Sequence, residues 1–157
     1  KWYPYDESVK VPLIISQPEE FQSGRKDDQH LASGLDIMPT MCDLAGIPSP
    51  PHLAGHSLRP ILENKTTTWR EFVAAETQLV GRMLRTEQYK YVKYPNDPIE
   101  QLFDMKADPW EMVNLFDQPK YADTIEAHRK LLAGWEASLS PVEPSPIFPL
   151  KHFSDKA

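Results

Sequence analysis

Apolar and polar residues alternate with a period of two in the second half of the chain, from about Trp69 onward. Such alternation is typical of strands that bury one face, and the turns between the alternating stretches are short. We therefore predict a small antiparallel sheet of four strands, at residues 71–76, 82–86, 89–94 and 101–104.

The second hairpin of this sheet has a register that the alternation predicts. If residues 87–88 form a two-residue turn, Leu84 faces Tyr91 across the hairpin. Met83 then faces Val92. The turn lacks the Gly or Asn that two-residue hairpins prefer, so this register depends on the apolar pattern alone.

One longer helix is predicted after the sheet. Pro119 fits the first turn of such a helix, and Pro141 ends it. We expect the helix to cover one face of the sheet and to bury Trp135 there. Its apolar stripe, with spacings of four and three, consists of Tyr121, Ile125, His128, Leu132, Trp135 and Leu139.

The first half of the chain opens with a different pattern. Residues 12–15 form a short, continuous apolar run, which favours a strand at residues 13–16 that is buried on both faces. A central strand needs neighbours on both sides to satisfy its backbone N–H and C=O groups. Because nothing upstream supplies them, we expect the chain to begin in the middle of a domain.

A short helix is expected in the middle of the first half. Ser33 and Asp36 resemble a capping box, but a helix that starts there would place Pro39 in its interior. We therefore predict a turn at residues 33–38 and a helix at residues 39–45, with proline in its first turn. The predicted buried face of this helix consists of Ile37, Met41, Leu44 and Ala45.

Composition narrows the classes of partner. The formal net charge of −6 argues against nucleic acid or an anionic membrane surface, because both require a basic face. A small anionic ligand remains possible, since a few local cations hold it. No apolar run is long enough to span a membrane. Cys42 is the single cysteine, and we expect it to be a buried hydrophobe.

Residue chemistry alone indicates no active site. The chain has no glycine-rich phosphate loop and no Cys/His set with metal-ligand spacing, and its histidines are scattered. The sequence Asn64-Lys65-Thr66 is a glycosylation sequon, which is also a frequent chance pattern. Arg82 and Lys93 face each other across the predicted hairpin, where like charges repel. Such a pair persists more readily with an acidic side chain or an anion between the two cations, and an ordinary solvated edge is the alternative.

Several blocks of the sequence resemble type I sulfatases. The opening, with Lys1 followed four residues later by Tyr5 and then by the apolar run, is similar to a stretch of that family. The further matching blocks occur in the family's order, at residues 33–40, 44–47, 55–62, 82–86, 89–92 and 100–115.

The resemblance implies that this chain is the C-terminal third of a formylglycine-dependent sulfatase of the alkaline phosphatase superfamily. The implied fold is α/β: the end of a large mixed-sheet domain, then a small four-stranded antiparallel sheet packed by a C-terminal helix. Residues 1–66 would belong to the catalytic domain, residues 67–140 to the small subdomain, and residues 141–157 to a proline-rich extended tail. The family resemblance further implies a periplasmic, secreted or lysosomal location.

The family's mechanism uses a formylglycine beside a bound Ca²⁺. The formylglycine arises from a Cys or Ser in a Cys/Ser-x-Pro-x-Arg motif, which this chain does not contain. The resemblance therefore makes the N-terminal portion of the same enzyme the partner that supplies nucleophile and metal. A small sulfated molecule is the implied substrate.

Lys1 corresponds to the family lysine that contacts the sulfate oxygens, so the resemblance makes Lys1 the catalytic candidate. Candidates for the rim of the substrate pocket are His56, Arg59, Glu76 and Arg82. We interpret Tyr5 as an aromatic side chain that packs the turn.

Two other functions remain open. A phosphate or phosphonate ester hydrolase of the same superfamily would share these blocks. Alternatively, the small sheet and helix would serve only as a structural or binding cap without catalysis.

Overall fold

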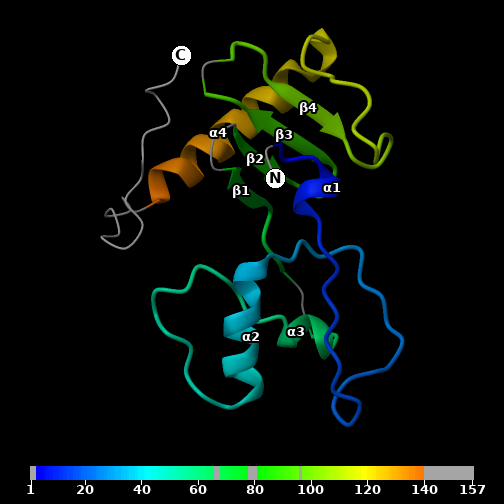
Figure 1. Cartoon of the computed structure of the whole chain (residues 1–157), viewed down its shortest axis with the longest axis vertical. Coiled ribbons are helices and arrows are strands. Elements are labelled where there is room, and N and C mark those ends of the chain that lie inside the picture. The colour runs from blue at the N-terminus through cyan, green and yellow to red at the C-terminus, as the bar shows by residue number, and fades with distance from the viewer. Residues whose placement is uncertain (1–2, 66–67, 78–80, 96, 140–157) are drawn as a thin grey trace, which may run out of the picture.

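A computed structural model describes residues 3–65, 68–77, 81–95 and 97–139. Figure 1 shows two parts, one built on a sheet and a long helix, the other on two short helices and long loops. The elements are α1 (Asp6–Val9), a 3₁₀ turn (Gly34–Asp36), α2 (Ile37–Leu44), α3 (Arg59–Leu62), β1 (Val73–Thr77), β2 (Gly81–Arg85), β3 (Tyr89–Lys93), β4 (Gln101–Asp104), a second 3₁₀ turn (Pro119–Tyr121) and α4 (Ala122–Ser138).

The four strands pair in the order β1-β2-β3-β4, and each pair is antiparallel. Leu84 faces Tyr91 and Met83 faces Val92, so the predicted register is confirmed. The α/β class, with a small antiparallel sheet followed by a helix, is confirmed as well. Two strands are displaced: β1 begins at Val73, two residues later than predicted, and β2 begins at Gly81, one residue earlier.

Helix α4 covers one face of the sheet, as the apolar stripe predicts (Figure 1). Trp135 is partly buried against this core, and the helix ends at Ser138. Pro141, the predicted end of the helix, lies outside the described residues. The buried core between sheet and helix consists of Leu84, Tyr91, Leu102, Leu115, Ile125 and Leu132.

The opposite face of the sheet is also covered. Met83, Val92 and Phe103 point to that face, since side chains alternate along a strand, and all three are buried. The segment 3–6 packs here: Pro4 is fully buried, and the rings of Tyr5 and Phe103 lie 6.2 Å apart. The sheet is thus a middle layer between α4 and the beginning of the chain.

Helix α2 begins earlier than predicted, at Ile37, and the 3₁₀ turn before it carries the Ser33–Asp36 capping box. Pro39 is the third residue of the helix, where its missing N–H would have no intrahelical acceptor.

The predicted buried face of α2 is wrong. Ile37 and Met41 are exposed, whereas Pro39, Thr40 and Cys42 are buried. The reason is the approach of residue 58: Thr40 Oγ1 accepts the Leu58 N–H (2.9 Å) and donates to the Asp36 carbonyl (2.6 Å). The prediction of a buried Cys42 is confirmed.

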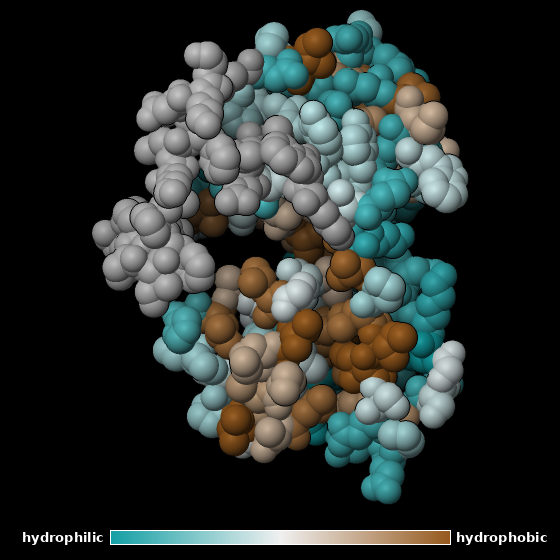
Figure 2. All heavy atoms as spheres, in the orientation of Figure 1, coloured by the Kyte–Doolittle hydropathy of each residue, from teal (hydrophilic) through white to brown (hydrophobic). Residues whose placement is uncertain are grey.

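The predicted strand at residues 13–16 is not formed. The segment is extended without a ladder partner among the described residues, and Leu13 and Ile14 are exposed, Ile14 by 87%. Without neighbouring strands an apolar run cannot join a sheet. Figure 2 shows apolar side chains gathered over the part of the molecule that holds α2 and α3. The exposed apolar residues of this part include Val11, Leu13, Ile14, Leu35, Ile37, Met38, Met41 and Ile47.

Candidate functional site

The segment next to Lys1 is held on the sheet by a buried ion-pair triad of Asp6, Lys90 and Glu111. Lys90 Nζ lies 2.8 Å from Asp6 Oδ1 and 2.7 Å from Glu111 Oε1. The Asp6 backbone N–H donates to Glu111 Oε2 (N···O 2.7 Å). The Lys90 side chain is fully buried and that of Glu111 is 2% exposed, whereas the Asp6 side chain is 25% exposed, so the inner pair is shielded from solvent and Asp6 lies at its edge.

The sheet and a tight turn place the two inner members of this triad. Lys90 alternates with Tyr89 and Tyr91 in β3 and therefore points to the face opposite α4. Glu111 has φ 56°, a left-handed conformation that non-glycine residues seldom adopt. Its N–H donates to the Asp108 carbonyl (3.2 Å), and the Asp108 side chain accepts the Val113 N–H (2.8 Å). The turn thus aims the Glu111 carboxylate at Lys90.

Arg85 lies on the same face of the sheet as Lys90, directly opposite it in the pairing of β2 with β3. Burial lowers the pKa of its guanidinium, although the carboxylates of Asp6 and Glu111 oppose that shift. Arg85 Nη1 donates to the Thr86 carbonyl. Two cations and two carboxylates therefore share this side of the sheet.

Aromatic contacts complete the hold on residues 3–6. The Tyr3 ring lies 6.1 Å from that of Tyr94, edge to face. Burial raises the pKa of Tyr94 to about 12, and its hydroxyl donates to Gln101 Oε1 (3.3 Å). Lys1, the catalytic candidate, lies outside the described residues, so its role stays a prediction.

His56 belongs to a second polar cluster, with the buried Asp36 and the largely buried Arg70, while His56 itself is exposed. Asp36 Oδ1 accepts the His56 backbone N–H (2.9 Å) and lies 2.5 Å from Arg70 Nη2. Arg70 Nη2 is also 2.9 Å from His56 Nδ1. Asp36 Oδ2 accepts the Ser33 N–H (2.7 Å). Asp36 is fully buried. Its hydrogen bonds join the loop at residue 56 to the start of α2.

Trp69 lies between His56 and a third polar network. Its ring centroid is 5.9 Å from that of His56 and 6.2 Å from that of His30, and its Nε1–H donates to the Leu31 carbonyl (2.7 Å). The Arg70 guanidinium lies 5.1 Å from the same ring. Trp69, which shortly precedes β1, thus packs against histidines from two loops.

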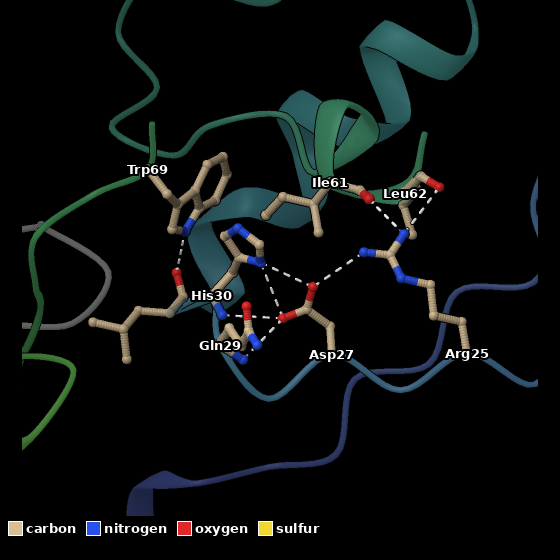
Figure 3. A network of polar contacts seen from close by, with 8 residues as sticks. Arg25, Asp27, Gln29, His30, Ile61, Leu62 and Trp69 are labelled. Atoms are coloured by element: carbon tan, nitrogen blue, oxygen red, sulfur yellow. Dashed lines mark hydrogen bonds and ion pairs between the residues drawn. The ribbon is translucent and has the colours of Figure 1, made fainter. Parts of the chain in front are cut away.

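Figure 3 shows how Asp27 organises the loop of residues 17–29. Its carboxylate accepts the backbone N–H groups of Gln29 (3.1 Å) and His30 (3.0 Å), and His30 Nδ1 lies 2.9 Å from Oδ2. Burial raises the pKa of Asp27, but these hydrogen bonds outweigh it and hold the pKa below its usual value. Arg25 ties the loop to α3 by donating to the Ile61 carbonyl (2.6 Å). The network is a loop anchor.

Arg59 is paired with two carboxylates. Its Nε lies 2.7 Å from Glu63 Oε1, and its Nη1 lies 3.3 Å from Asp43 Oδ1. Hydrogen bonds to Glu63 and Asp43 raise the pKa of Arg59. A shallow groove of about 400 Å³ opens beside this pair, and both Asp43 and His56 line it. An anion that bound to Arg59 would compete with these carboxylates.

Glu76 and Arg82 are brought together by the β1–β2 ladder. Arg82 Nε lies 2.7 Å from Glu76 Oε2, and Nη1 lies 2.8 Å from Glu136 Oε1 of α4. Hydrogen bonds to Glu136 and Glu76 raise the pKa of Arg82. Arg82 does face Lys93, and the carboxylates of Glu76 and Glu136 pair with Arg82.

The four rim candidates do not form one cluster. His56 and Arg59 lie in the part with α2 and α3, each with its own partners. Glu76 and Arg82 lie on the sheet, where Arg82 pairs with α4, on the face opposite to residues 3–6. Their role at a pocket rim stays a prediction.

Three charged residues at these clusters were not predicted from the sequence, namely Arg70, Lys90 and Glu111, and Asp36 was predicted only as part of a capping box. A signal existed for Lys90: it stands between Tyr89 and Tyr91 while its face also carries the apolar Val92, which indicates a sheet covered on both sides. The pairing of Glu111 with Lys90 could not be predicted from the sequence, because the left-handed turn at Glu111 is set by tertiary contacts.

Metal ligands are not gathered in the described part of the chain: no three His, Cys, Asp or Glu side chains there could hold an ion together. Nor does any helix among the described residues have both the length and the apolar character needed to cross a membrane.

A family model described as "N-sulphoglucosamine sulphohydrolase, C-terminal" matches residues 1–137. The chain is 40% identical over 137 residues to a Δ4,5-hexuronate-2-O-sulfatase of Bacteroides thetaiotaomicron. That match covers 82% of this chain and 28% of the relative, so the chain spans little more than a quarter of the relative's length.

Solved structures of sulfatases are also similar to this chain. A Bacteroides thetaiotaomicron protein presumed to be a sulfatase superposes with a TM-score of 0.74 at 37% identity, over 91% of this chain and 34% of that one. A phosphonate monoester hydrolase of Agrobacterium radiobacter is less similar, with a TM-score of 0.61 at 25% identity, over 77% of this chain and 29% of that one.

Proposed function

Because this chain belongs to the family of N-sulphoglucosamine sulphohydrolase C-terminal regions, we propose that it is the C-terminal part of a sulfatase that hydrolyses sulfate esters. The observation that carries the proposal is the family match over residues 1–137, together with relatives that are sulfatases several times longer than the match.

The chemistry that the chain lacks supports a division of labour. It contains no Cys/Ser-x-Pro-x-Arg motif for a formylglycine. Its described residues offer no group of metal ligands, so a Ca²⁺ ion does not fit them. An upstream portion of the same enzyme would supply both the nucleophile and the metal. The contribution of this chain is then to bind and to position.

Lys1 would make the direct contribution to the reaction. Sulfuryl transfer, like phosphoryl transfer, spreads negative charge over the peripheral and leaving oxygens. A compact ammonium aimed at those oxygens stabilises the transition state where water is excluded. By analogy with a lost oxyanion donor, removing this charge would cost roughly 10²–10³ in rate.

The substrate we propose is a small sulfated sugar. The hexuronate-2-O-sulfatase relative is 40% identical to this chain, which favours a sulfated uronate-containing saccharide over an alkyl sulfate. His56, Arg59, Glu76 and Arg82 would lie at the pocket rim. That role would appear as a raised KM on substitution, whereas each of the two partly exposed ion pairs of Arg82 by itself predicts at most about 1 kcal/mol of lost stability.

The domain division is part of the same proposal. Residues 1–66 would complete the large α/β domain, and residues 67–140 would form the small subdomain. The exposed apolar run at residues 11–14 supports it, because in this chain the run has no strand to pair with. The tail at residues 141–157 lies outside the described residues.

The test is Lys1→Ala in the complete enzyme, with Lys26→Ala as the matched control. Lys26 is 84% exposed and has one ion pair, at 3.6 Å from Asp28. We expect Lys1→Ala to lower kcat roughly 10²–10³-fold at an unchanged melting temperature. An unchanged kcat would refute the role of Lys1. The 157-residue chain alone should not hydrolyse 4-nitrophenyl sulfate, and turnover by it would refute the division of labour.

A phosphonate ester hydrolase is the second candidate, since such an enzyme shares the fold at lower similarity. Comparing kcat/KM of the complete enzyme for matched sulfate and phosphonate monoesters separates the two. A complete chain without a Cys/Ser-x-Pro-x-Arg motif would favour the third candidate, a non-catalytic cap.

A further inference from the structure

We propose that Lys90 and Glu111 are positioning residues for the sulfatase reaction: through Asp6 they fix the segment that carries Lys1. The proposal rests on the function proposed above, and it assigns a role to the face of the small sheet that residues 3–6 cover, opposite α4. Neither residue would touch the substrate.

The triad holds both the main chain and the side chain of Asp6. Glu111 Oε2 accepts the backbone N–H of Asp6, and Lys90 Nζ lies 2.8 Å from its carboxylate. Lys90 and Glu111 are themselves joined at 2.7 Å, which closes the triangle. A contact to the side chain alone would leave the backbone free to rotate. Together the three contacts restrain the translation and rotation of the segment.

Each anchor lies in a hydrogen-bonded element. Lys90 stands in the third strand of the sheet, paired with β2 on one side and β4 on the other. Glu111 is fixed in a left-handed turn between Asp108 and Val113. The position of the Lys90 charge is therefore set by the sheet, and that of the Glu111 charge by the turn after β4. Residues 3–6 are held in place relative to these two charges.

The remaining contacts extend this restraint toward Lys1. Pro4, whose φ angle is fixed by its ring, is fully buried. Tyr3 and Tyr5 pack on Tyr94 and Phe103. Lys1 precedes Asp6 by five residues, a span of at most about 18 Å of extended chain. Small displacements count, since about 1 Å of misplacement can cost about 10²-fold in rate.

Stability alone does not explain a buried triad of this kind. Desolvating an ammonium and two carboxylates is costly, and apolar residues of similar volume often stabilise a protein as well or better. Directional charge pairs differ from an apolar contact in that they permit one register only. Arg85 on the same face offsets the second carboxylate, so the group is close to neutral.

The experiment is a double-mutant cycle in the complete enzyme between Glu111→Gln and Lys1→Ala, with kcat, KM and melting temperature measured. The assay uses a 2-O-sulfated hexuronate saccharide, or 4-nitrophenyl sulfate if that is turned over. We expect Glu111→Gln to lower kcat about 10- to 100-fold with KM nearly unchanged. In the Lys1→Ala background the same substitution should change kcat less than 2- to 3-fold, because the group being positioned is gone.

Glu100→Gln is the matched control. Glu100 is a carboxylate 14% exposed and paired with Arg129 of α4 at 2.8 Å, on the other side of the sheet. It should lower the melting temperature while kcat is retained. If Glu111→Gln fails to fold, Asp6→Asn carries the cycle, since Asp6 is 25% exposed and tolerates the change more easily.

Equal losses of kcat in both backgrounds, or a lowered melting temperature with kcat intact, would overturn the positioning role. Those outcomes leave the proposed function standing, because Lys1→Ala alone would still lower kcat. A Lys1→Ala enzyme with full kcat would instead refute the role of Lys1, and with it the positioning role.

Discussion

Arg70 Nη2 lies 2.5 Å from Oδ1 of Asp36, a carboxylate that is fully buried at the start of α2. The same oxygen accepts the N–H of His56, and the other accepts the N–H of Ser33. One carboxylate therefore ties three separate segments together.

Asp36→Ala should cost about 3–5 kcal/mol, because it leaves the largely buried Arg70 cation and two backbone donors without their acceptor. Asp28→Asn is the control, since Asp28 is 71% exposed and has a single pair with Lys26. Urea unfolding of the complete enzyme measures both. A loss below about 1 kcal/mol for Asp36→Ala would show that the cluster is not formed as described.

Gly55 lies directly against the backbone of Leu35 and Asp36. A Cβ added at Gly55 would overlap the Leu35 carbonyl and come within 2.9 Å of the Asp36 nitrogen. Since these are backbone atoms, Gly55→Ala must displace the loop from α2, at a cost of about 1–3 kcal/mol or more.

Gly134→Ala is the matched control for Gly55. Gly134 lies in α4 with open space around the position of a Cβ, so alanine there should stabilise by about 0.5–1 kcal/mol. Thermal unfolding should therefore shift in opposite directions for the two variants. Equal shifts would contradict the close approach of Gly55 to residues 35–36.

Asp27 should contribute to acid sensitivity. Its pKa is held below the usual value by hydrogen bonds from residues 29–30 despite burial. A depressed carboxyl pKa stabilises the folded state above the unfolded pKa, near 4, and this contribution is lost as the pH falls through the folded pKa.

Asp27→Asn should therefore lower the melting temperature at pH 5–7, and the difference from the parent enzyme should shrink below about pH 4. Asp28→Asn, at an exposed carboxylate in the same loop, should show no such convergence. A difference for Asp27→Asn that stays constant down to pH 3 would be incompatible with the observed loop anchor.

The sheet could be predicted from the sequence because its information is local. Alternation sets which side chains share a face, and a short turn sets the register, so Leu84 and Tyr91 are paired correctly. The stripe of α4 is local in the same sense. Helix α2 is not: its buried side is chosen by Leu58, eighteen residues away from Thr40, and the pattern of apolar residues pointed to the wrong side.

The triad was missed for a related reason. Asp6, Lys90 and Glu111 are far apart in sequence, 84 positions separating the first two, and each is an ordinary surface residue by type. Only the second covered face of the sheet, with Val92 and Phe103, makes Lys90 a buried cation. The family resemblance identified Lys1 as a candidate, but it assigned no role to Lys90 or Glu111.

A substitution at Ile14 tests whether this residue lies on the surface of the complete enzyme or packs against its upstream portion. It is 87% exposed in this chain, so a true surface position would tolerate Ile14→Asp within about 0.5 kcal/mol. The proposed division of domains predicts the contrary, because a strand at residues 13–16 would be flanked by strands of the upstream portion. A buried, unpaired carboxylate there should cost several kcal/mol.

Ile99→Asp is the control for Ile14, at a position 57% exposed in the loop before β4, and the division of domains assigns no partner to it. Soluble yield and unfolding of the complete enzyme should fall sharply for Ile14→Asp and stay near the parent values for Ile99→Asp. If both variants behave like the parent, residues 13–16 lie on the enzyme's surface, and the assignment of residues 1–66 to a large sheet domain is wrong.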